Sequence, residues 1–214
     1  MIRKKARFIT FEGGDGAGKT TLIEKVYAYL ARQGHKVVCT RAPGGTQIGT
    51  EIRRLLLGKH PVSMSARCEL FLFLADRAQH VDEIIRPALD TQHIVLCDRF
   101  NDSTLAYQGC ARGFDSKWLE KLLHFASGDL IPDLTLYLDL APEIGFERAK
   151  KERSAPDRIE SEALAFHRKI RRSFRQIARQ NPQRFITINA AQSPEHVFEQ
   201  AKEKIDGLLR NTRK

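Results

Sequence analysis

Eight consecutive residues near the amino terminus have the types and the spacing needed to hold phosphate groups. The stretch from Gly13 to Thr20 reads GGDGAGKT and fits the pattern G-x-x-x-x-G-K-[ST], whose backbone N–H groups wrap nucleotide phosphates. Lys19 adds a positive charge for the terminal phosphates, and the Thr20 hydroxyl is placed to hold Mg²⁺. The predicted nucleotide-binding residues are Gly13, Gly14, Asp15, Gly16, Ala17, Gly18, Lys19 and Thr20.

The residues on both sides of this loop favour a strand that leads into it and a helix that leaves it. Residues 7–11 form a short apolar run, and apolar residues follow at near-helical spacing between residues 21 and 32. A helix that begins at Lys19 would aim the positive end of its dipole at the phosphates. Because this context disfavours a chance glycine-rich turn, we predict nucleotide binding.

A carboxylate followed directly by an arginine ends a later apolar run. Asp98 can hold Mg²⁺ through water, and Arg99 can form paired hydrogen bonds with the phosphate of a second substrate. A structural salt bridge at a strand end is the alternative. We favour binding because ligands of open α/β sheets lie at the carboxyl ends of the strands. The Asn-Lys-x-Asp motif with which GTPases bind guanine is absent from the sequence.

Six motifs, in their order and spacing, resemble those of the thymidylate kinase family over essentially the whole chain. They are FEG at 11–13, TRAPGGT at 40–46, FLADR at 73–77, DRF at 98–100, STLAYQG at 103–109 and DRIE at 157–160. The resemblance implies a P-loop nucleoside monophosphate kinase that uses Mg-ATP to convert deoxythymidine monophosphate (dTMP) to the diphosphate. In such a transfer the acceptor phosphate is itself the nucleophile, so cations matter more than a general base.

The resemblance also assigns roles to individual residues. The implied catalytic cations are Lys19, Arg99, Arg148 and Arg153, and the implied magnesium ligands are Thr20 and Asp98. The implied dTMP ligands are Asp15, Arg53, Phe73, Arg77, Arg99, Ser103, Thr104, Tyr107 and Gln108. Phe73 and Arg77 are four residues apart, so on a helix they share a face and suit the ring and O4 of a pyrimidine. Core packing is the alternative for Phe73.

Two positions depart from what some or most members of the family carry. In one subclass an arginine follows the loop aspartate, whereas Gly16-Ala17 stands here. We expect a mobile basic lid at about 148–158 to replace that cation through Arg148 or Arg153, helped by Lys150 and Lys151; a solvated basic loop is the alternative. The family's Arg-Glu-Pro-Gly-Gly block has Ala42 in place of glutamate, which we expect to weaken acceptor binding without changing the activity.

The apolar runs predict one doubly wound α/β domain over residues 1–214, a single P-loop kinase domain with a five-stranded parallel sheet flanked by helices. Most of the strand-like runs are continuously apolar, as in parallel strands that helices cover on both faces. The expected strands are 7–12, 36–40, 93–97, 134–139 and 184–189. The expected helices are 19–33, 46–58, 65–90, 116–127, 142–150, 160–180 and 194–211.

Composition bounds the partners and the surroundings of the chain. Its 214 residues carry a formal charge of +10, which suits polyanionic nucleotide substrates. No apolar run approaches the ~20 residues of a membrane span, so we expect no membrane partner. Cys39 and Cys97 lie at the ends of apolar runs and predict buried free thiols, hence a reduced, cytoplasmic protein. The apolar stretch 70–74 and the resemblance predict a homodimer.

Two other functions stay open at this point. A deoxynucleoside kinase would phosphorylate a sugar hydroxyl and would need a carboxylate base there. A non-catalytic nucleic-acid-binding protein with a vestigial loop would explain the positive charge. Five arginines share one face of the helix expected at 160–180, while its aromatic residues lie on the other; we therefore interpret the basic face as solvated surface and expect no nucleic acid. These arginines are Arg168, Arg171, Arg172, Arg175 and Arg179.

Overall fold

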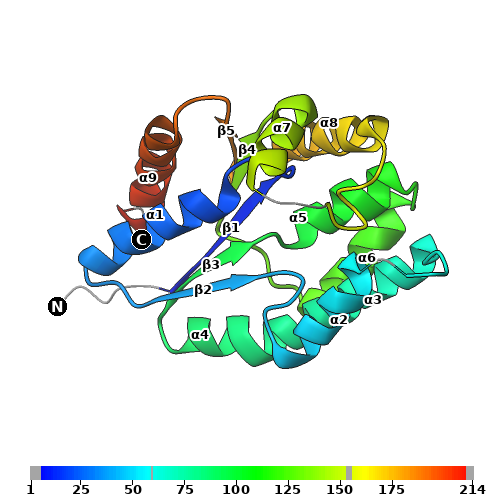
Figure 1. The fold of residues 1–214 in the computed structure, drawn as a ribbon. Coiled ribbons are helices and arrows are strands. Elements are labelled where there is room, and N and C mark those ends of the chain that lie inside the picture. Colours follow the sequence, from blue (N-terminus) through cyan, green and yellow to red (C-terminus); the bar gives the residue numbers. More distant parts are fainter. Residues whose placement is uncertain (1–5, 59, 153–155, 211–214) are drawn as a thin grey trace.

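One parallel sheet of five strands forms the centre of the protein (Figure 1). The computed structural model describes residues 6–58, 60–152 and 156–210. The strands are β1 (Arg7–Gly13), β2 (Val37–Arg41), β3 (Ile94–Asp98), β4 (Leu134–Asp139) and β5 (Phe185–Asn189), in the spatial order β2-β3-β1-β4-β5. All four pairings are parallel. The predicted fold class is confirmed, and each strand boundary agrees with the prediction to within one residue.

Helices cover both faces of this sheet (Figure 1). They are α1 (Lys19–Arg32), α2 (Gln47–Leu57), α3 (Ala66–His80), α4 (Arg86–Asp90), α5 (Asn101–Thr104), α6 (Ser116–Ser127), α7 (Pro142–Glu152), α8 (Leu164–Gln180) and α9 (Pro194–Arg210). Two π-helical segments, η1 (Val81–Ile85) and η2 (Leu105–Ala111), continue α3 and α5. None of the described helices is long and apolar enough to cross a membrane.

The central strand β1 shows why the strands read as apolar on both faces. Ile9 and Phe11 pack into the core that α1 and α9 form with one face of the sheet. Phe8 packs on the other face, against residues of η1 and α4. Because successive side chains alternate across a strand, Thr10 and Glu12 share the face of Phe8, and both are fully buried. This face therefore contains polar groups that need partners.

The structure corrects the expected helices in three places. Residues 101–111 are helical although no helix was predicted there. The prediction missed them because Asn, Asp, Ser, Thr and Gly are weak helix formers. Helix α8 begins at Leu164 rather than at 160, since the Asp157 carboxylate accepts the amides of Ile159 and Glu160 and closes a turn. The helix expected at 65–90 contains the π-helical segment η1 just before Pro87, which has no N–H to donate.

The cysteines and the basic helix face also differ from the predictions. All four cysteines are free and Cys97 is buried, but Cys39 is exposed because β2 is an edge strand. The basic face of α8 is more than solvated surface. Arg171 and Arg175 both donate to the Asp139 carboxylate at the end of β4, with shortest distances of 2.7 Å. Two arginines thus anchor α8 to the sheet.

Candidate active site

A cavity of about 560 Å³ opens at the carboxyl edge of the sheet. The loop after β1 and the ends of β2 and β3 reach it, together with residues from α3, η2 and α7. Among its lining residues are most of the predicted site, namely Asp15, Gly16, Ala17, Gly18, Lys19, Thr20, Arg53, Phe73, Arg77, Asp98, Arg99, Ser103, Thr104, Tyr107, Gln108 and Arg148. Gly13 and Gly14 lie at the start of the loop, outside this lining. Arg153 lies outside the described residues.

The phosphate loop joins β1 to α1 as the sequence predicts. Gly18 has φ +87° and caps α1, a left-handed conformation that favours glycine. Lys19 is 9% exposed, and its Nζ donates to the carbonyl oxygens of Gly13 and Gly14 at 3.2 and 3.0 Å. Burial lowers the pKa of the Lys19 ammonium. The lysine is thereby held across its own loop, in position to meet an anion there.

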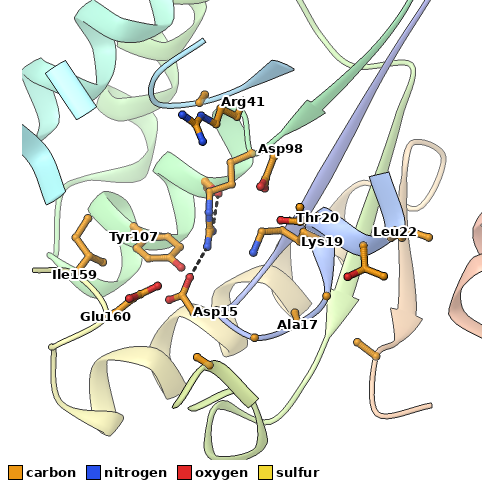
Figure 2. A pocket seen from close by; sticks show the side chains of 18 of the residues that line it. Asp15, Ala17, Lys19, Thr20, Leu22, Arg41, Asp98, Tyr107, Ile159 and Glu160 are labelled. Atoms are coloured by element: carbon orange, nitrogen blue, oxygen red, sulfur yellow. Dashed lines mark hydrogen bonds and ion pairs between the residues drawn. The ribbon is translucent and has the colours of Figure 1, made fainter. Parts of the chain in front are cut away.

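The loop aspartate faces an arginine instead of the phosphate region. Arg99 Nη2 donates to Asp15 Oδ1 at 3.0 Å, a contact drawn in Figure 2. Its Nη1 donates to Ser103 Oγ at 3.3 Å, and its guanidinium carbon lies 5.2 Å from the centre of the Tyr107 ring. These contacts bring together four residues predicted for the acceptor side and fix the guanidinium at the cavity wall.

Asp98 has the features of a cation ligand. Its Oδ1 is buried and has no hydrogen-bond partner among the described residues. Figure 2 shows its carboxylate directed toward the loop that carries Lys19 and Thr20. The described residues contain no cluster of three His, Cys, Asp or Glu side chains that could enclose a metal. A single carboxylate and a hydroxyl nevertheless suit Mg²⁺, which keeps several waters and takes its other ligands from nucleotide phosphates.

Helix α3 lines the end of the cavity that is predicted to hold the base. Arg77 is 2% exposed and its guanidinium carbon lies 4.2 Å from the centre of the Phe100 ring, but its Nε and Nη1 have no hydrogen-bond partner in the part of the chain that the structure describes. Phe73 is half-buried at the cavity wall on the same helix. Buried donors without partners are rare in native proteins, so Arg77 calls for a polar ligand. Gln108 is also buried there, but its amide nitrogen donates to Glu69 at 3.0 Å.

The loop after β2 supports the remaining wall. Ala42 is 4% exposed and its cis peptide bond leads to Pro43, whose carbonyl oxygen accepts from Arg53 at 2.9 Å. The buried Asp76 carboxylate on α3 accepts from the Gly44 amide at 2.8 Å. Arg53 therefore reaches the cavity while holding the loop that contains Ala42.

Part of the predicted lid is helical. Helix α7 runs on to Glu152, since Arg, Ala, Lys and Glu are good helix formers. Arg148 lines the cavity and donates to the Ala190 carbonyl oxygen at 3.0 Å. Lys150 is exposed and pairs with Glu147 at 3.2 Å. Of the predicted lid cations, Arg148 therefore lies at the cavity in the described part of the chain.

Comparisons with known proteins decide the family. The family model described as thymidylate kinase matches residues 11–201. The chain belongs to the thymidylate kinase family. It is 51% identical over 209 residues to the thymidylate kinase of Desulfovibrio desulfuricans, with 95% of this chain and 96% of that protein covered. It is 47% identical over 203 residues to that of Magnetococcus marinus, with 95% and 97% covered.

A solved structure of the family has the same fold. The crystal structure of thymidylate kinase from Ehrlichia chaffeensis superposes with a TM-score of 0.77 at 32% identity, covering 94% of this chain and 99% of that one. The resemblance predicted from the six motifs is thereby confirmed. Asp98 ends β3 and Arg99 follows it, at the sheet edge where parallel α/β proteins bind their ligands.

Sequence reasoning missed two buried carboxylates of this thymidylate kinase family member. Glu12 was noted as part of a motif but given no role, and burial together with the Asp102 charge raises its pKa to about 7. Asp102 on α5 forms a double hydrogen bond with Arg184, both distances being 2.8 Å. A carboxylate directly after the predicted buried run 7–11 was the available signal for Glu12.

Proposed function

We propose that this chain transfers the γ-phosphoryl group of ATP to dTMP, forming ADP and deoxythymidine diphosphate. Membership of the thymidylate kinase family supports this reaction. The observation that carries it is that the phosphate loop after β1 and Arg99 after β3 line the same cavity. Two phosphate-binding elements in one cavity suit a reaction between two nucleotides, because such a transfer requires cations on both sides of the moving group.

On the donor side, the loop amides and Lys19 bind the phosphates of ATP. The unpartnered Asp98 oxygen and the Thr20 hydroxyl are the candidate ligands of Mg²⁺. The ion would neutralise charge on the phosphates between which the transfer occurs. The low pKa of Lys19 relative to an exposed lysine would rise when phosphate replaces the carbonyl contacts, since an adjacent anion favours the charged form.

On the acceptor side, Arg99 binds the dTMP phosphate and Asp15 holds the Arg99 guanidinium from beneath. Phe73 stacks on the thymine ring and Arg77 donates to its O4, which would satisfy the unpartnered Arg77 nitrogens. Tyr107 closes the sugar subsite and disfavours a 2′-hydroxyl. Ser103, Thr104, Gln108 and Arg53 complete the acceptor wall.

An acceptor panel tests this proposal. Incubation with Mg-ATP and dTMP, dUMP or thymidine should phosphorylate dTMP best, dUMP more weakly and thymidine not at all, as measured by chromatography of the products. Phosphorylation of thymidine at the rate of dTMP would favour the deoxynucleoside kinase, because thymidine offers a sugar hydroxyl and no phosphate for Arg99. No turnover with any acceptor would exclude both kinases.

We further propose that the chain forms a homodimer through α3 and α6. The two helices pack on one another through Leu70, Leu74, Leu119 and Leu123. Each then leaves large apolar side chains outside: Phe71 is 57% exposed, Trp118 45% and Phe125 89%. Exposed apolar surface on neighbouring helices is typical of a protein–protein interface, and a second copy of this chain would cover it.

A further inference from the structure

Glu12 is a buried carboxylate that the proposed reaction leaves without a role. It lies near the end of β1 and its residue is 0% exposed. Its Oε1 accepts from the Phe100 and Ser103 amides at 2.8 and 3.3 Å, and its Oε2 accepts from Ser103 Oγ at 2.5 Å. All three hydrogen bonds go to the turn and short helix that follow Arg99. Glu12 therefore holds the segment that carries the acceptor arginine.

The Ser103 hydroxyl lies between this carboxylate and the arginine. An arginine can only donate hydrogen bonds, and an ionised carboxylate can only accept them. When Glu12 is ionised, Ser103 Oγ, which contacts both Glu12 and Arg99, points its hydrogen to Glu12 and a lone pair to Arg99 Nη1, 3.3 Å away. The carboxylate thus sets the direction of the hydrogen bond that Arg99 makes.

The backbone at Arg99 also needs support from outside the turn. Arg99 has φ +67°, a conformation that few residues other than glycine adopt. Such a conformation persists where surrounding contacts determine it. Its own amide donates to the Phe11 carbonyl oxygen at 2.9 Å, and the next amide in the chain is the one that Glu12 accepts. The end of β1 therefore fixes both sides of this residue.

We propose that Glu12 is the positioning residue of Arg99: it fixes the turn and the orientation of the Ser103 hydroxyl, so that the guanidinium is held where the acceptor phosphate binds. This proposal rests on the proposed function, in which Arg99 binds the phosphate of dTMP. Asp15 holds one terminal nitrogen of Arg99, and Glu12 holds the other through Ser103. The two contacts together remove the freedom of a long side chain before substrate arrives.

The variant Glu12→Gln tests the role because it keeps the shape and removes the charge. Its amide nitrogen would donate to Ser103 Oγ, so the hydroxyl would accept from both the new amide and Arg99 and its own hydrogen would lose the carboxylate acceptor that orients it. We expect KM for dTMP to rise about tenfold, as for the loss of a hydrogen bond to a charged group, while KM for ATP stays unchanged. Helix α5 should stay in place because Asp102 and Arg184 anchor it independently.

Thr10→Val is the matched control. Thr10 lies on the same face of the same strand, is 0% exposed, and hydrogen bonds to Thr135 at 2.8 Å, so its side chain reaches α5 only indirectly, through the 3.4 Å contact of Thr135 with Asp102. Its loss should lower the free energy of unfolding and leave KM for dTMP unchanged. If Thr10→Val raises KM for dTMP as much as Glu12→Gln does, the effect is general softening of β1 and the proposal is wrong.

A double-mutant cycle with Arg99→Ala separates positioning from structural support. If Glu12 acts through Arg99, Glu12→Gln should have no further effect on kcat/KM for dTMP once Arg99 is alanine. An undiminished effect in that background would overturn the proposal. If Arg99→Ala lowers kcat/KM for dTMP but Glu12→Gln does not, the positioning role of Glu12 is wrong while the proposed function of Arg99 stands. If Arg99→Ala itself changes nothing, the proposed function of Arg99 fails, and the role of Glu12 with it.

A second variant covers the case in which Glu12→Gln fails to fold. Ser103→Ala removes the hydroxyl that joins Glu12 to Arg99 and leaves the two amide contacts of the carboxylate intact. It should raise KM for dTMP to a similar extent in a protein whose fold circular dichroism confirms, and it should have no further effect once Arg99 is alanine, because a direct contact of Ser103 with dTMP would persist in that background. An unchanged KM for dTMP in folded Ser103→Ala would overturn the proposal.

Discussion

At the scale of single residues, buried charges lie beside the proposed phosphate sites. The Asp15–Arg99 pair is the main example, because both side chains are less than 20% exposed. Truncating one partner of such a pair leaves the other charge buried and uncompensated, which costs more than the net value of the pair. Glu12 is buried more completely than either member of this pair, at 0% exposed, and burial raises the pKa of its carboxyl group to about 7.

The stability of Glu12→Gln relative to the native chain should depend on pH. Burial, together with the Asp102 charge, raises the Glu12 pKa from 4.5 to about 7, so between these values the folded state binds more protons than the unfolded state. Stability from this group is therefore present below pH 4.5 and is lost as pH rises through 7. The native chain should lose about 2 kcal/mol relative to Glu12→Gln between pH 5 and 8 in urea unfolding.

The other charged groups near Glu12 do not change this expectation. They are present in both the native chain and Glu12→Gln, so their contributions to the free energy of unfolding cancel in the difference between the two. These groups are Lys19, Arg77, Arg99, Asp102 and Arg184. If the difference in free energy of unfolding between the two proteins stays constant from pH 5 to 8, Glu12 is ionised throughout this range. That result would contradict a raised pKa for Glu12.

Replacing Ala42 by glutamate should strengthen acceptor binding. The side chain lines the cavity beside Arg53, whose pKa is lowered by burial and by the nearby Arg41 charge. A carboxylate there would relieve the repulsion between the two arginines, and we expect KM for dTMP to fall about threefold. In the control Ala42→Gln, the side chain has the size of glutamate without its charge, and this variant should not lower KM for dTMP. Equal kinetics of both variants and the native chain would mean that the site has adapted to alanine.

At the scale of elements, the contact between α7 and the phosphate loop is backbone to backbone. A Cβ on Gly16 would collide with the Gly145 carbonyl group, and a Cβ on Gly145 would collide with the Asp15 carbonyl oxygen. Both neighbours are backbone atoms, so an added Cβ could be accommodated only if the helix or the loop moved. The helix that carries Arg148 thus rests directly on the loop that carries Asp15.

Gly145→Ala should therefore displace the phosphate loop. We expect ATP to bind about tenfold more weakly, measured by calorimetry, because the loop amides would no longer converge on the phosphates. Gly207→Ala in α9 is the control, since a Cβ there meets nothing within 4 Å and alanine favours a helix by about 1 kcal/mol. Native ATP affinity in folded Gly145→Ala would mean that α7 moves freely on the loop.

Arg148 is the cation of α7 that we expect to act on the transferred group. Arg148→Ala should lower kcat about tenfold or more and leave ATP affinity nearly intact, because such a contact forms mainly in the transition state. Lys150→Ala, three-quarters exposed and paired with Glu147, serves as the comparison and should have little effect. A kcat of Arg148→Ala equal to the native value would leave the charge to Arg153 or to another residue.

At the scale of the whole molecule, net charge and exposed apolar surface are the features that no single site explains. A formal charge of +10 creates a field that raises the local concentration of nucleotide anions. The exposed apolar side chains Phe71, Trp118 and Phe125 of α3 and α6 do not line the cavity, although α3 contributes Phe73 and Arg77 to its lining. Association through these helices would therefore place a partner behind Phe73 and Arg77.

Light scattering should give twice the chain mass of 24.4 kDa at micromolar concentration. Phe71→Glu should produce a folded monomer, because a charge in the centre of an apolar interface is costly to bury. Ile131→Glu is the control, since Ile131 is equally exposed at 57% but lies in the loop between α6 and β4. A monomeric native chain, or a dimer that persists in Phe71→Glu, would contradict the proposed interface.

The sequence by itself determined the fold class, the phosphate loop and the strand end at Asp98 and Arg99. Each depends on local patterns: continuous apolar runs mark buried parallel strands, and glycine spacing marks a loop that wraps an anion. Apolar periodicity placed nearly all helix ends within two residues. It failed at 101–111, where weak helix formers are held by distant partners such as Glu12 and Arg184.

Only the tertiary structure decided how the charged residues pair. The Asp15–Arg99 contact joins residues 84 positions apart, and the Glu12–Ser103 contact spans 91. No local pattern encodes such pairs, because they arise when separate strand ends meet at one edge of the sheet. Burial then sets their chemistry: a carboxylate that is ordinary in sequence acquires a raised pKa once water is removed from it. Residue types are fixed by sequence, but their protonation and partners follow from packing.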